Sequence, residues 1–193
     1  AIFIDGDFLD CYSISSFNTD PTRPTMKEEI AYGVDLLQKL KKWTGAKIFY
    51  KFGNHEQRLE YYLRKKAPEI FDCEEFRLQY LMKLSELDIE FIKENQIAYI
   101  GNLPVLHGHE IGIRNVMVNP ARSLFLKTQK SAMCAHLHVP SQHNQKSPID
   151  GKIISTWSVG HLGDEHPEYL PHNGWVHGGA RIEVGADGDY EVI

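Results

Sequence analysis

Cysteine is scarce in this 193-residue sequence, and long apolar runs are missing. The three cysteines, Cys11, Cys73 and Cys134, are odd in number and far apart, and none belongs to a CxxC pair. This pattern argues against a disulfide framework and a cysteine-based zinc site, and it indicates reduced thiols in the cytoplasm. No segment approaches the ~20 apolar residues that cross a bilayer. No charged stretch followed by an apolar one opens the chain, so we expect neither a secretion signal nor a membrane partner.

An excess of positive charge is also missing. The formal net charge is −5, which gives no general attraction to nucleic acid, although a local basic path can still form. The hydrophobic fraction of 42% and the charged fraction of 24% are those of an ordinary globular protein. The length suffices for one well-buried core, so we predict a single domain over residues 1–193. The one residue type in excess is histidine, which occurs ten times.

Four short polar clusters directly follow apolar runs. They are Gly6-Asp7-Phe8-Leu9-Asp10, Gly53-Asn54-His55-Glu56, His107-Gly108-His109-Glu110 and Ala135-His136-Leu137-His138. In α/β sheets, ligand-binding residues gather beyond the carboxyl ends of strands. Residues two apart in extended backbone point to the same side, which predicts that His136 and His138 face one point. Carboxylate, carboxamide and imidazole groups suit divalent transition metals, and two such ions can bind the attacking and leaving oxygens of a phosphoryl group.

The remaining pattern predicts alternating strands and helices, hence an α/β fold. We expect strands over residues 1–4, 47–52, 88–92, 96–100, 103–106, 131–135, 152–159, 175–184 and 190–193. We expect helices over 26–43, 57–66, 74–84 and 120–130. Thr25 with Glu28 forms a capping box for the first helix, and Asn119 caps the last. Residues 141–148 read as an exposed loop, and Asp187-Gly188 reads as a hairpin turn.

The four clusters resemble the motifs of the calcineurin-like metallophosphoesterases. That family has Asp-x-His, then Gly-Asp-x-x-Asp, Gly-Asn-His-Asp/Glu, a His-Gly-His-like motif and Gly-His-x-His. All but the first stand here in that order, between residues 6 and 138. The tail, with Trp-Ser-Val-Gly at 157–160 and Asn-Gly-Trp-Val-His-Gly at 173–178, is similar to the phage-type subgroup. The resemblance implies a four-layer αββα sandwich of two mostly mixed β-sheets flanked by helices.

The resemblance also implies a site for two divalent transition-metal ions, chosen among Mn, Fe, Zn, Ni and Co. Asp7 would bridge the two ions. One ion would also be held by Asn54, His107 and His136. His138 would reach the other ion.

The resemblance makes His55 the general acid, which donates a proton to the leaving alkoxide while metal-activated water attacks the phosphorus. Asp10 would support a site residue, contact the phosphate or cap a helix. His109 would support the site, contact the phosphate or make a plain structural hydrogen bond. Glu56 would cap the following helix or orient His55. The basic stretch from Arg58 to Lys66 is a solvated helix face or a contact for a phosphate backbone.

The chain departs from the family pattern in two places. Ala135 replaces the glycine before the last His-x-His, which is a mild change. No Asp-x-His motif precedes Gly6, and without it the ion reached by His138 keeps only Asp7 and His138 as ligands. The chain opens inside a strand, so we expect that it is truncated at its N-terminus and that the motif lies one βα unit upstream, ~30 residues.

These patterns predict a metallophosphoesterase that acts on a phosphodiester or phosphomonoester, including a nucleotide or nucleic acid, in the cytoplasm (the host cytoplasm, if phage-encoded). An alternative is a metal-binding scaffold that has kept the fold and lost the chemistry. A purely structural metal site is a third interpretation. The histidines after residue 140 are expected to be structural or exposed, although His161 follows Gly160 in a loop that could border the site.

Overall fold

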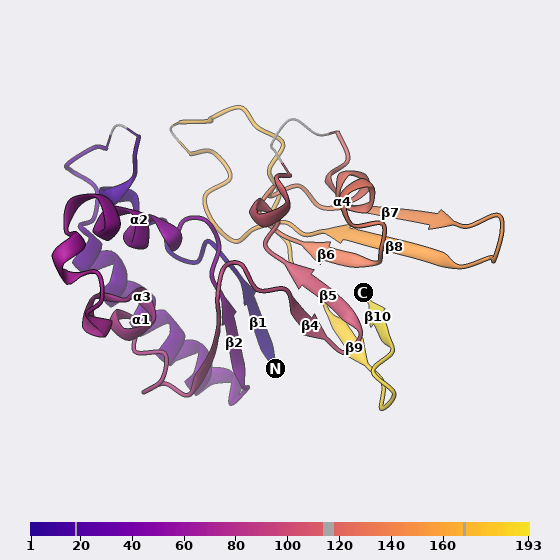
Figure 1. Cartoon of the computed structure of the whole chain (residues 1–193), viewed down its shortest axis with the longest axis horizontal. Coiled ribbons are helices and arrows are strands. Elements are labelled where there is room, and N and C mark those ends of the chain that lie inside the picture. Colours follow the sequence, from indigo (N-terminus) through magenta and orange to yellow (C-terminus); the bar gives the residue numbers. More distant parts are fainter. Residues whose placement is uncertain (18, 114–117, 168) are drawn as a thin grey trace. The chain divides into compact units, whose positions relative to one another are not determined.

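A computed structural model describes residues 1–17, 19–113, 118–167 and 169–193 (Figure 1). The chain divides into two compact units, Ala1–Glu94 and Asn95–Ile193. Each unit has its own β-sheet and its own cluster of buried apolar side chains. That these units make a single domain stays a prediction.

The N-terminal unit is built on a parallel three-stranded sheet. Its strands are β1 (Ile2–Asp5), β2 (Ile48–Lys51) and β3 (Ile89–Ile92), in that order. Parallel neighbours need long crossover connections. These contain α1 (Met26–Thr44) between β1 and β2, and α2 (Gln57–Lys66) and α3 (Leu78–Leu81) between β2 and β3. Three 3₁₀ turns complete the unit: η1 (Tyr12–Ile14), η2 (Pro68–Ile70) and η3 (Glu74–Phe76).

Local sequence signals fix the bounds of α1. The Glu28 N–H donates to Thr25 Oγ1 at 3.3 Å, and the Thr25 N–H donates to Glu28 Oε2 at 2.9 Å, so the predicted capping box is confirmed. Gly45 ends the helix in the left-handed conformation, with φ +62°. Leu37 of α1 packs with Ile48 and Tyr50 of β2 in the core of this unit.

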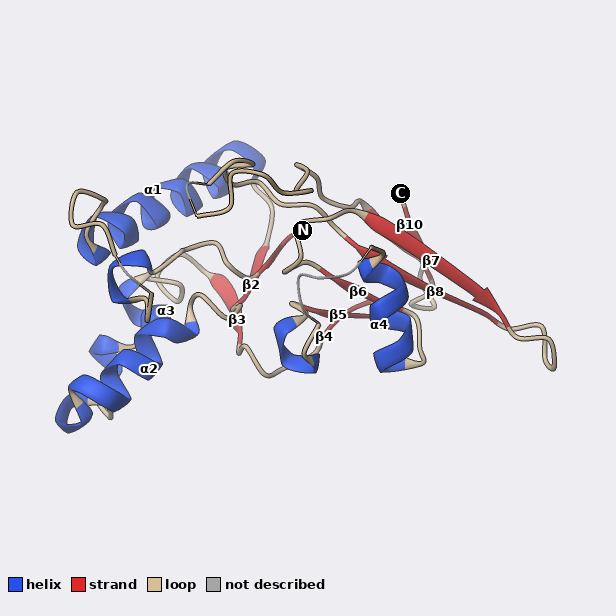
Figure 2. Ribbon diagram, turned by 90° about the horizontal axis from the view of Figure 1, so that it is seen from above, coloured by secondary structure: helices blue, strands red, loops and turns tan. Residues whose placement is uncertain are grey.

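The C-terminal unit is built on a mixed five-stranded sheet. Its strand order is β4 (Ala98–Ile100), β5 (Leu103–Leu106), β6 (Ala132–Cys134), β8 (Ile153–Ser158) and β7 (Ser141–Lys146). The middle strands β5, β6 and β8 are parallel, and the edge strands β4 and β7 are antiparallel to their neighbours. Helix α4 (Pro120–Thr128) packs against β6, β7 and β8 (Figure 2). A 3₁₀ turn, η4 (His109–Ile111), follows β5, and β9 (Ile182–Val184) pairs with β10 (Tyr190–Val192).

The predicted α/β class is confirmed. Two main sheets and the helices that pack with them are the parts that the expected αββα sandwich requires. The Asn119 cap of α4 is confirmed by the Arg122 N–H, which donates to Asn119 Oδ1 at 2.9 Å. The Asp187-Gly188 turn is confirmed between β9 and β10, with Gly188 at φ +84°.

Three predicted elements are wrong in part. Residues 74–84 do not form one helix, because Arg77 is extended (ψ 140°) and separates η3 from the single turn of α3. The polar residues 141–146 form the edge strand β7, where polar side chains are acceptable because most of this strand is exposed. Of residues 175–184, only Ile182–Val184 is a strand, since Gly178 and Gly179 interrupt the pattern before it.

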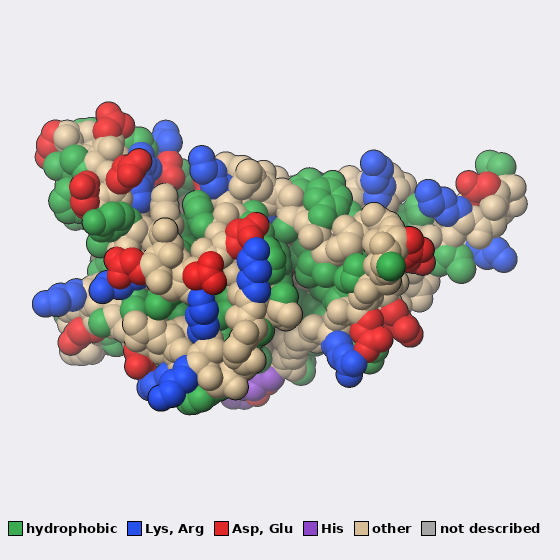
Figure 3. Space-filling view, turned by 90° about the horizontal axis from the view of Figure 1, so that it is seen from below, with side chains coloured by type: hydrophobic (Ala, Val, Ile, Leu, Met, Phe, Trp, Pro, Cys, Tyr) green, Lys and Arg blue, Asp and Glu red, His purple; other side chains and the backbone are tan. Residues whose placement is uncertain are grey.

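On the face seen in Figure 3, acidic and basic side chains are interspersed, and apolar side chains lie between them. Within the described ranges, no helix combines the length and the apolar character that crossing a membrane requires.

Candidate metal and phosphate site

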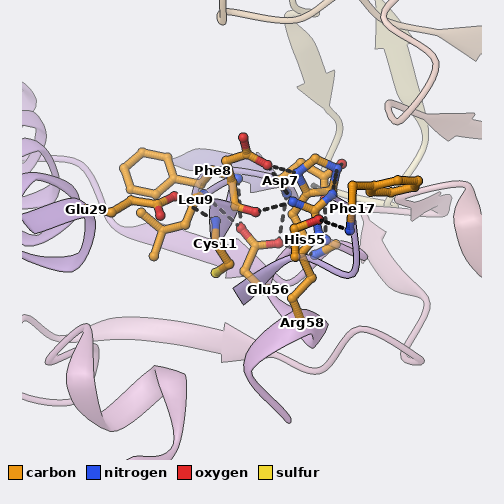
Figure 4. Close-up of polar contacts among 12 residues, drawn as sticks. Asp7, Phe8, Leu9, Cys11, Phe17, Glu29, His55, Glu56 and Arg58 are labelled. Carbon is orange, nitrogen blue, oxygen red and sulfur yellow. Dashed lines mark hydrogen bonds and ion pairs between the residues drawn. The ribbon is translucent and has the colours of Figure 1, made fainter. Parts of the chain in front are cut away.

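The loop after β1 carries Asp7 and is held by a single side chain. Gly6 (φ 77°) and Asp7 (φ 50°) both adopt left-handed backbone, which turns the chain sharply at the strand end. The carboxylate of Glu56 accepts the N–H of Asp7 at 2.9 Å, of Phe8 at 2.8 Å and of Leu9 at 3.1 Å (Figure 4). The position of Asp7 is therefore set by Glu56.

Glu56 is buried, with 2% of its surface exposed. It also accepts the Gly53 N–H at 2.8 Å and the Tyr50 hydroxyl at 2.7 Å, so it joins the loops that follow β1 and β2. Burial raises the pKa of Glu56 and the nearby Asp7 charge raises it further, whereas these hydrogen bonds act in the opposite direction. Its side chain makes no capping hydrogen bond to α2, so the predicted capping role of Glu56 is wrong. That Glu56 orients His55 stays a prediction.

The ring of His55 lies between the carboxylate of Asp10 and the guanidinium of Arg58. Its Nδ1 is 2.9 Å from Asp10 Oδ1, a distance at which the ring N–H donates to the carboxylate. Its Nε2 is 3.2 Å from Arg58 Nη2. Its backbone N–H donates to Asp7 Oδ1 at 3.0 Å, which places the histidine next to the loop after β1 (Figure 4).

Asp10 fixes both His55 and Arg58. Arg58 Nη1 donates to Asp10 Oδ1 at 2.6 Å and to the Asp10 carbonyl at 2.7 Å. Burial alone would raise the pKa of Asp10, but His55 and Arg58 outweigh it and hold that pKa below its usual value. None of these contacts caps a helix, so they do not support the predicted capping role of Asp10. Its role as a support for a site residue is the predicted alternative that the contacts favour.

The surroundings of Arg58 differ from the solvated helix face that the sequence predicts as one alternative. The prediction of a solvated helix face does not hold for it, because its side chain is 20% exposed and is paired with Asp10. Further along α2, the prediction fits better: Arg64 pairs with Glu60 four residues earlier, and both side chains are substantially exposed.

Asn54 presents a carboxamide oxygen without a protein donor. Its Oδ1 is buried and accepts no hydrogen bond among the described residues. A buried acceptor that is left unmatched costs free energy. An amide oxygen in this state is suited to a cation.

In the C-terminal unit, three histidines gather after β5 and β6. The ring centroids of His107 and His136 are 5.0 Å apart, those of His107 and His109 are 5.3 Å apart, and those of His109 and His136 are 6.1 Å apart. His107 is buried. Gly108 has φ +122°, and a Cβ added at this position would lie 3.2 Å from His136 Cβ, so glycine lets the two loops lie close together. Imidazole nitrogens are ligands that transition metals accept, although the ligand atoms of these three rings do not all lie within 4.8 Å of one another.

Glu110 holds the loop after β5 as Glu56 holds the loops after β1 and β2. Its carboxylate accepts the His107 N–H at 3.1 Å and the Gly108 N–H at 2.6 Å, and it lies 3.6 Å from His109 Nδ1. The Gly53–Glu56 and His107–Glu110 bonds both join a glutamate to the N–H three residues before it. That spacing is the sequence signal by which both positioning residues could have been found.

The predicted geometry of the last motif is wrong. β6 ends at Cys134, and His136 (φ 51°) and His138 (φ 59°) both adopt left-handed rather than extended backbone. The two rings therefore have different neighbours. His136 lies with His107 and His109, whereas His138 stacks on His161, with centroids 4.6 Å apart and planes 14° apart. The buried Leu137 anchors the turn between them in the core.

The His138–His161 stack was only partly foreseen, since His161 was expected to border the site. The ring of Trp175 packs edge-on against both histidine rings. Its centroid is 4.4 Å from that of His138 and 5.5 Å from that of His161. Burial lowers the pKa of His161, and the neighbouring His177 lowers it further. His161 is therefore favoured in its neutral form.

Among the described residues, no three His, Cys, Asp or Glu side chains of a single unit bring ligand atoms within 4.8 Å of one another. Asp7, Asn54 and His55 belong to the N-terminal unit, and His107, His109, His136 and His138 belong to the C-terminal unit.

Comparison with models of protein families finds no match to this chain, and comparison with curated proteins finds no matching sequence. The function is therefore inferred from the chemistry of the loops themselves.

Proposed function

We propose that this protein is a metal-dependent phosphoesterase that hydrolyses a phosphodiester or phosphomonoester. The observation that most supports the proposal is the Asp10–His55–Arg58 arrangement. An imidazole held by a carboxylate at Nδ1, with a guanidinium at 3.2 Å from Nε2, combines a proton donor with an anion-binding group. A scaffold or a purely structural metal site has no need for this pairing.

The donors of both units fit divalent transition-metal ions of the kind Mn, Fe, Zn, Ni or Co. The unmatched Oδ1 of Asn54 and the left-handed strand end at Asp7 support this in the N-terminal unit. Asp7, Asn54, His107 and His136 are the residues that would hold these ions, as the motif resemblance implies. His138 would be a ligand of the second ion. When bound, the ions would attract the phosphate oxygens and lower the pKa of the attacking water.

The side chains around His55 have separate tasks in this proposal. Asp10 accepts the hydrogen bond of Nδ1–H and so fixes the tautomer and the ring orientation. In the imidazolium form Nε2 carries a second proton, which would go to the leaving oxygen and leave a neutral ring with its proton on Nδ1. Arg58 can bind a phosphate oxygen through its planar fork, which would bring the leaving group next to Nε2. Glu56 and Glu110 hold the loops that carry Asp7, His55 and His107.

The proposed substrates include a nucleotide or a nucleic acid. Tight, unspecific binding of a duplex is not part of the proposal, because the net charge is −5 and the basic side chains seen in Figure 3 are interspersed with acidic ones. The proposed location is the cytoplasm, where the three free thiols would stay reduced.

The proposal is tested by measuring hydrolysis of a chromogenic phosphodiester and a chromogenic phosphomonoester with saturating Mn²⁺. We expect His55→Ala to lower kcat by about 100-fold or more, as loss of a general acid does. His172→Ala is the matched control, since His172 is an exposed histidine outside the site. Metal content is measured for all proteins. Equal rates for wild type and His55→Ala at equal metal content would contradict the proposal, and metal binding without any hydrolysis would favour the scaffold alternative.

A further inference from the structure

Two histidines of the C-terminal unit are held in a fixed stack by one backbone segment. The Val176 N–H donates to the His138 carbonyl at 3.0 Å, and the Val176 carbonyl accepts the His161 N–H at 3.2 Å. The Gly178 N–H then donates to the His161 carbonyl at 3.0 Å. A Cβ at Gly160 would collide with the Val176 carbonyl and the Gly178 nitrogen, so glycine is what lets these segments lie this close. His161 therefore has a position set by backbone contacts.

The hydrogen bonds of His161 define its tautomer. The Gly163 N–H donates to His161 Nδ1 at 3.1 Å, so Nδ1 uses its lone pair and carries no proton. In the neutral ring the single proton is then on Nε2. That Nε2 is buried, and no described residue accepts a hydrogen bond from it. A buried donor without an acceptor is costly, and its partner is best sought in a ligand.

This tautomer decides what kind of ligand His161 can take. A metal ion needs a lone pair, and Nε2–H has none to offer. An anionic oxygen needs a donor, which is what Nε2–H provides. The ring centroids of His161 and His138 are 4.6 Å apart. An anionic oxygen bound at His161 would therefore lie near the ion that we propose His138 binds.

We propose that His161 is a substrate-contacting residue whose Nε2–H donates to a phosphate oxygen held at the ion that His138 binds. The inference rests on the proposed function, because it takes His138 as a metal ligand. It assigns His161 to the phosphate and not to the metal. Trp175, packed against both rings, keeps the stack in place.

The test compares wild type with His161→Phe, which keeps a ring for the stack and lacks the donor, and with His161→Gln, which restores an N–H. Three quantities are measured on the Mn²⁺-loaded proteins: metal content, the Kd of inorganic phosphate by calorimetry, and KM for the phosphodiester. We expect His161→Phe to raise the Kd and KM by about 10- to 100-fold, as loss of a hydrogen bond to a charged group does. Metal content should be unchanged, and His161→Gln should recover part of the affinity.

The outcomes separate this inference from the proposed function. An unchanged phosphate Kd in His161→Phe, in a wild type that hydrolyses the substrate, would overturn the inference alone. Loss of one ion in His161→Phe would also overturn it, since His161 would then be a ligand. A phosphate Kd that depends on His161, in a wild type that hydrolyses nothing, would support the inference and contradict the phosphoesterase. A metal-loaded wild type that binds no phosphate would overturn both.

Discussion

The carboxylate of Glu56 accepts the backbone N–H of Asp7 at 2.9 Å, although the two residues are 49 positions apart. The same carboxylate accepts the Gly53 N–H, so one buried side chain spans the loops after two adjacent parallel strands. This relationship brings His55 next to Asp7, whose Oδ1 accepts the His55 N–H at 3.0 Å. The relative position of a proposed metal ligand and a proposed general acid is thus fixed within one unit.

Replacement of Glu56 by alanine should destabilise the N-terminal unit strongly. Four backbone N–H groups and the Tyr50 hydroxyl would lose their acceptor in a buried place. Each buried donor left unmatched costs about 1–3 kcal/mol, with some relief from water. We expect the free energy of unfolding to fall by roughly 3 kcal/mol or more, measured by urea denaturation.

Glu60→Ala is the matched control for this experiment. Glu60 lies in the first turn of α2, the helix that follows Glu56, and pairs with Arg64 where both side chains are substantially exposed. Its loss should therefore change the free energy of unfolding by less than about 1 kcal/mol. Equal effects of the two substitutions would show that Glu56 does not hold the loops.

Much of the fold was predictable because its signals are local. The Thr25–Glu28 capping box and Gly45 mark α1 in the sequence, and Asn119 marks α4. The edge strand β7 was missed because its pattern is polar, and only pairing with β8 makes it a strand. Tertiary context decides such segments.

For the candidate site, the sequence indicates which loops carry polar residues, but it does not predict how those residues are arranged in space. Polar clusters after apolar runs identified the loops that carry Asp7, Asn54 and His107. The left-handed backbone of His136 and His138 could not be predicted, because non-glycine residues seldom adopt it. The Glu56–Asp7 contact could not be predicted either, since nothing local links residues 49 positions apart.

Asp10 should make the stability of the protein depend on pH in the acid range. Its pKa is lowered in the folded state from the ordinary value of 3.8 by His55 and Arg58. Between the folded and unfolded pKa values the unfolded chain binds more protons, so stability falls as the pH falls. The contribution of Asp10 is complete above the unfolded pKa and is lost as the pH passes below the folded one.

Asp10→Asn measures this contribution. We expect the free energy of unfolding of wild type to exceed that of Asp10→Asn at pH 6, with a difference that shrinks as the pH is lowered from about 4. Asp72→Asn, which changes an exposed carboxyl of the same unit, is the control. A difference between wild type and Asp10→Asn that stays constant from pH 6 to pH 3 would rule out the ionised Asp10 as its source.

The three thiols should react at different rates with iodoacetamide. Cys11 and Cys134 are fully buried, whereas Cys73 is partly exposed. Burial raises the pKa of Cys11, and the charges of Glu29 and Glu56 raise it further, so little thiolate is present at pH 8. Mass spectrometry of the native protein should show one fast modification, at Cys73, and three modifications in denaturant. Fast labelling of native Cys73→Ser would contradict the burial of the other two thiols.

Removal of metal should abolish hydrolysis before it unfolds the protein. Each unit has an apolar core of its own, with Leu37, Ile48 and Tyr50 in one and Leu106 and Leu124 in the other. Chelation by EDTA should therefore leave the far-UV circular dichroism unchanged and keep a cooperative thermal transition, with Tm lowered only by the lost binding energy of the ions. Mn²⁺ added back should restore the rate. If the circular dichroism collapses together with the activity, the ions are structural, because a structural metal supplies the free energy of folding itself.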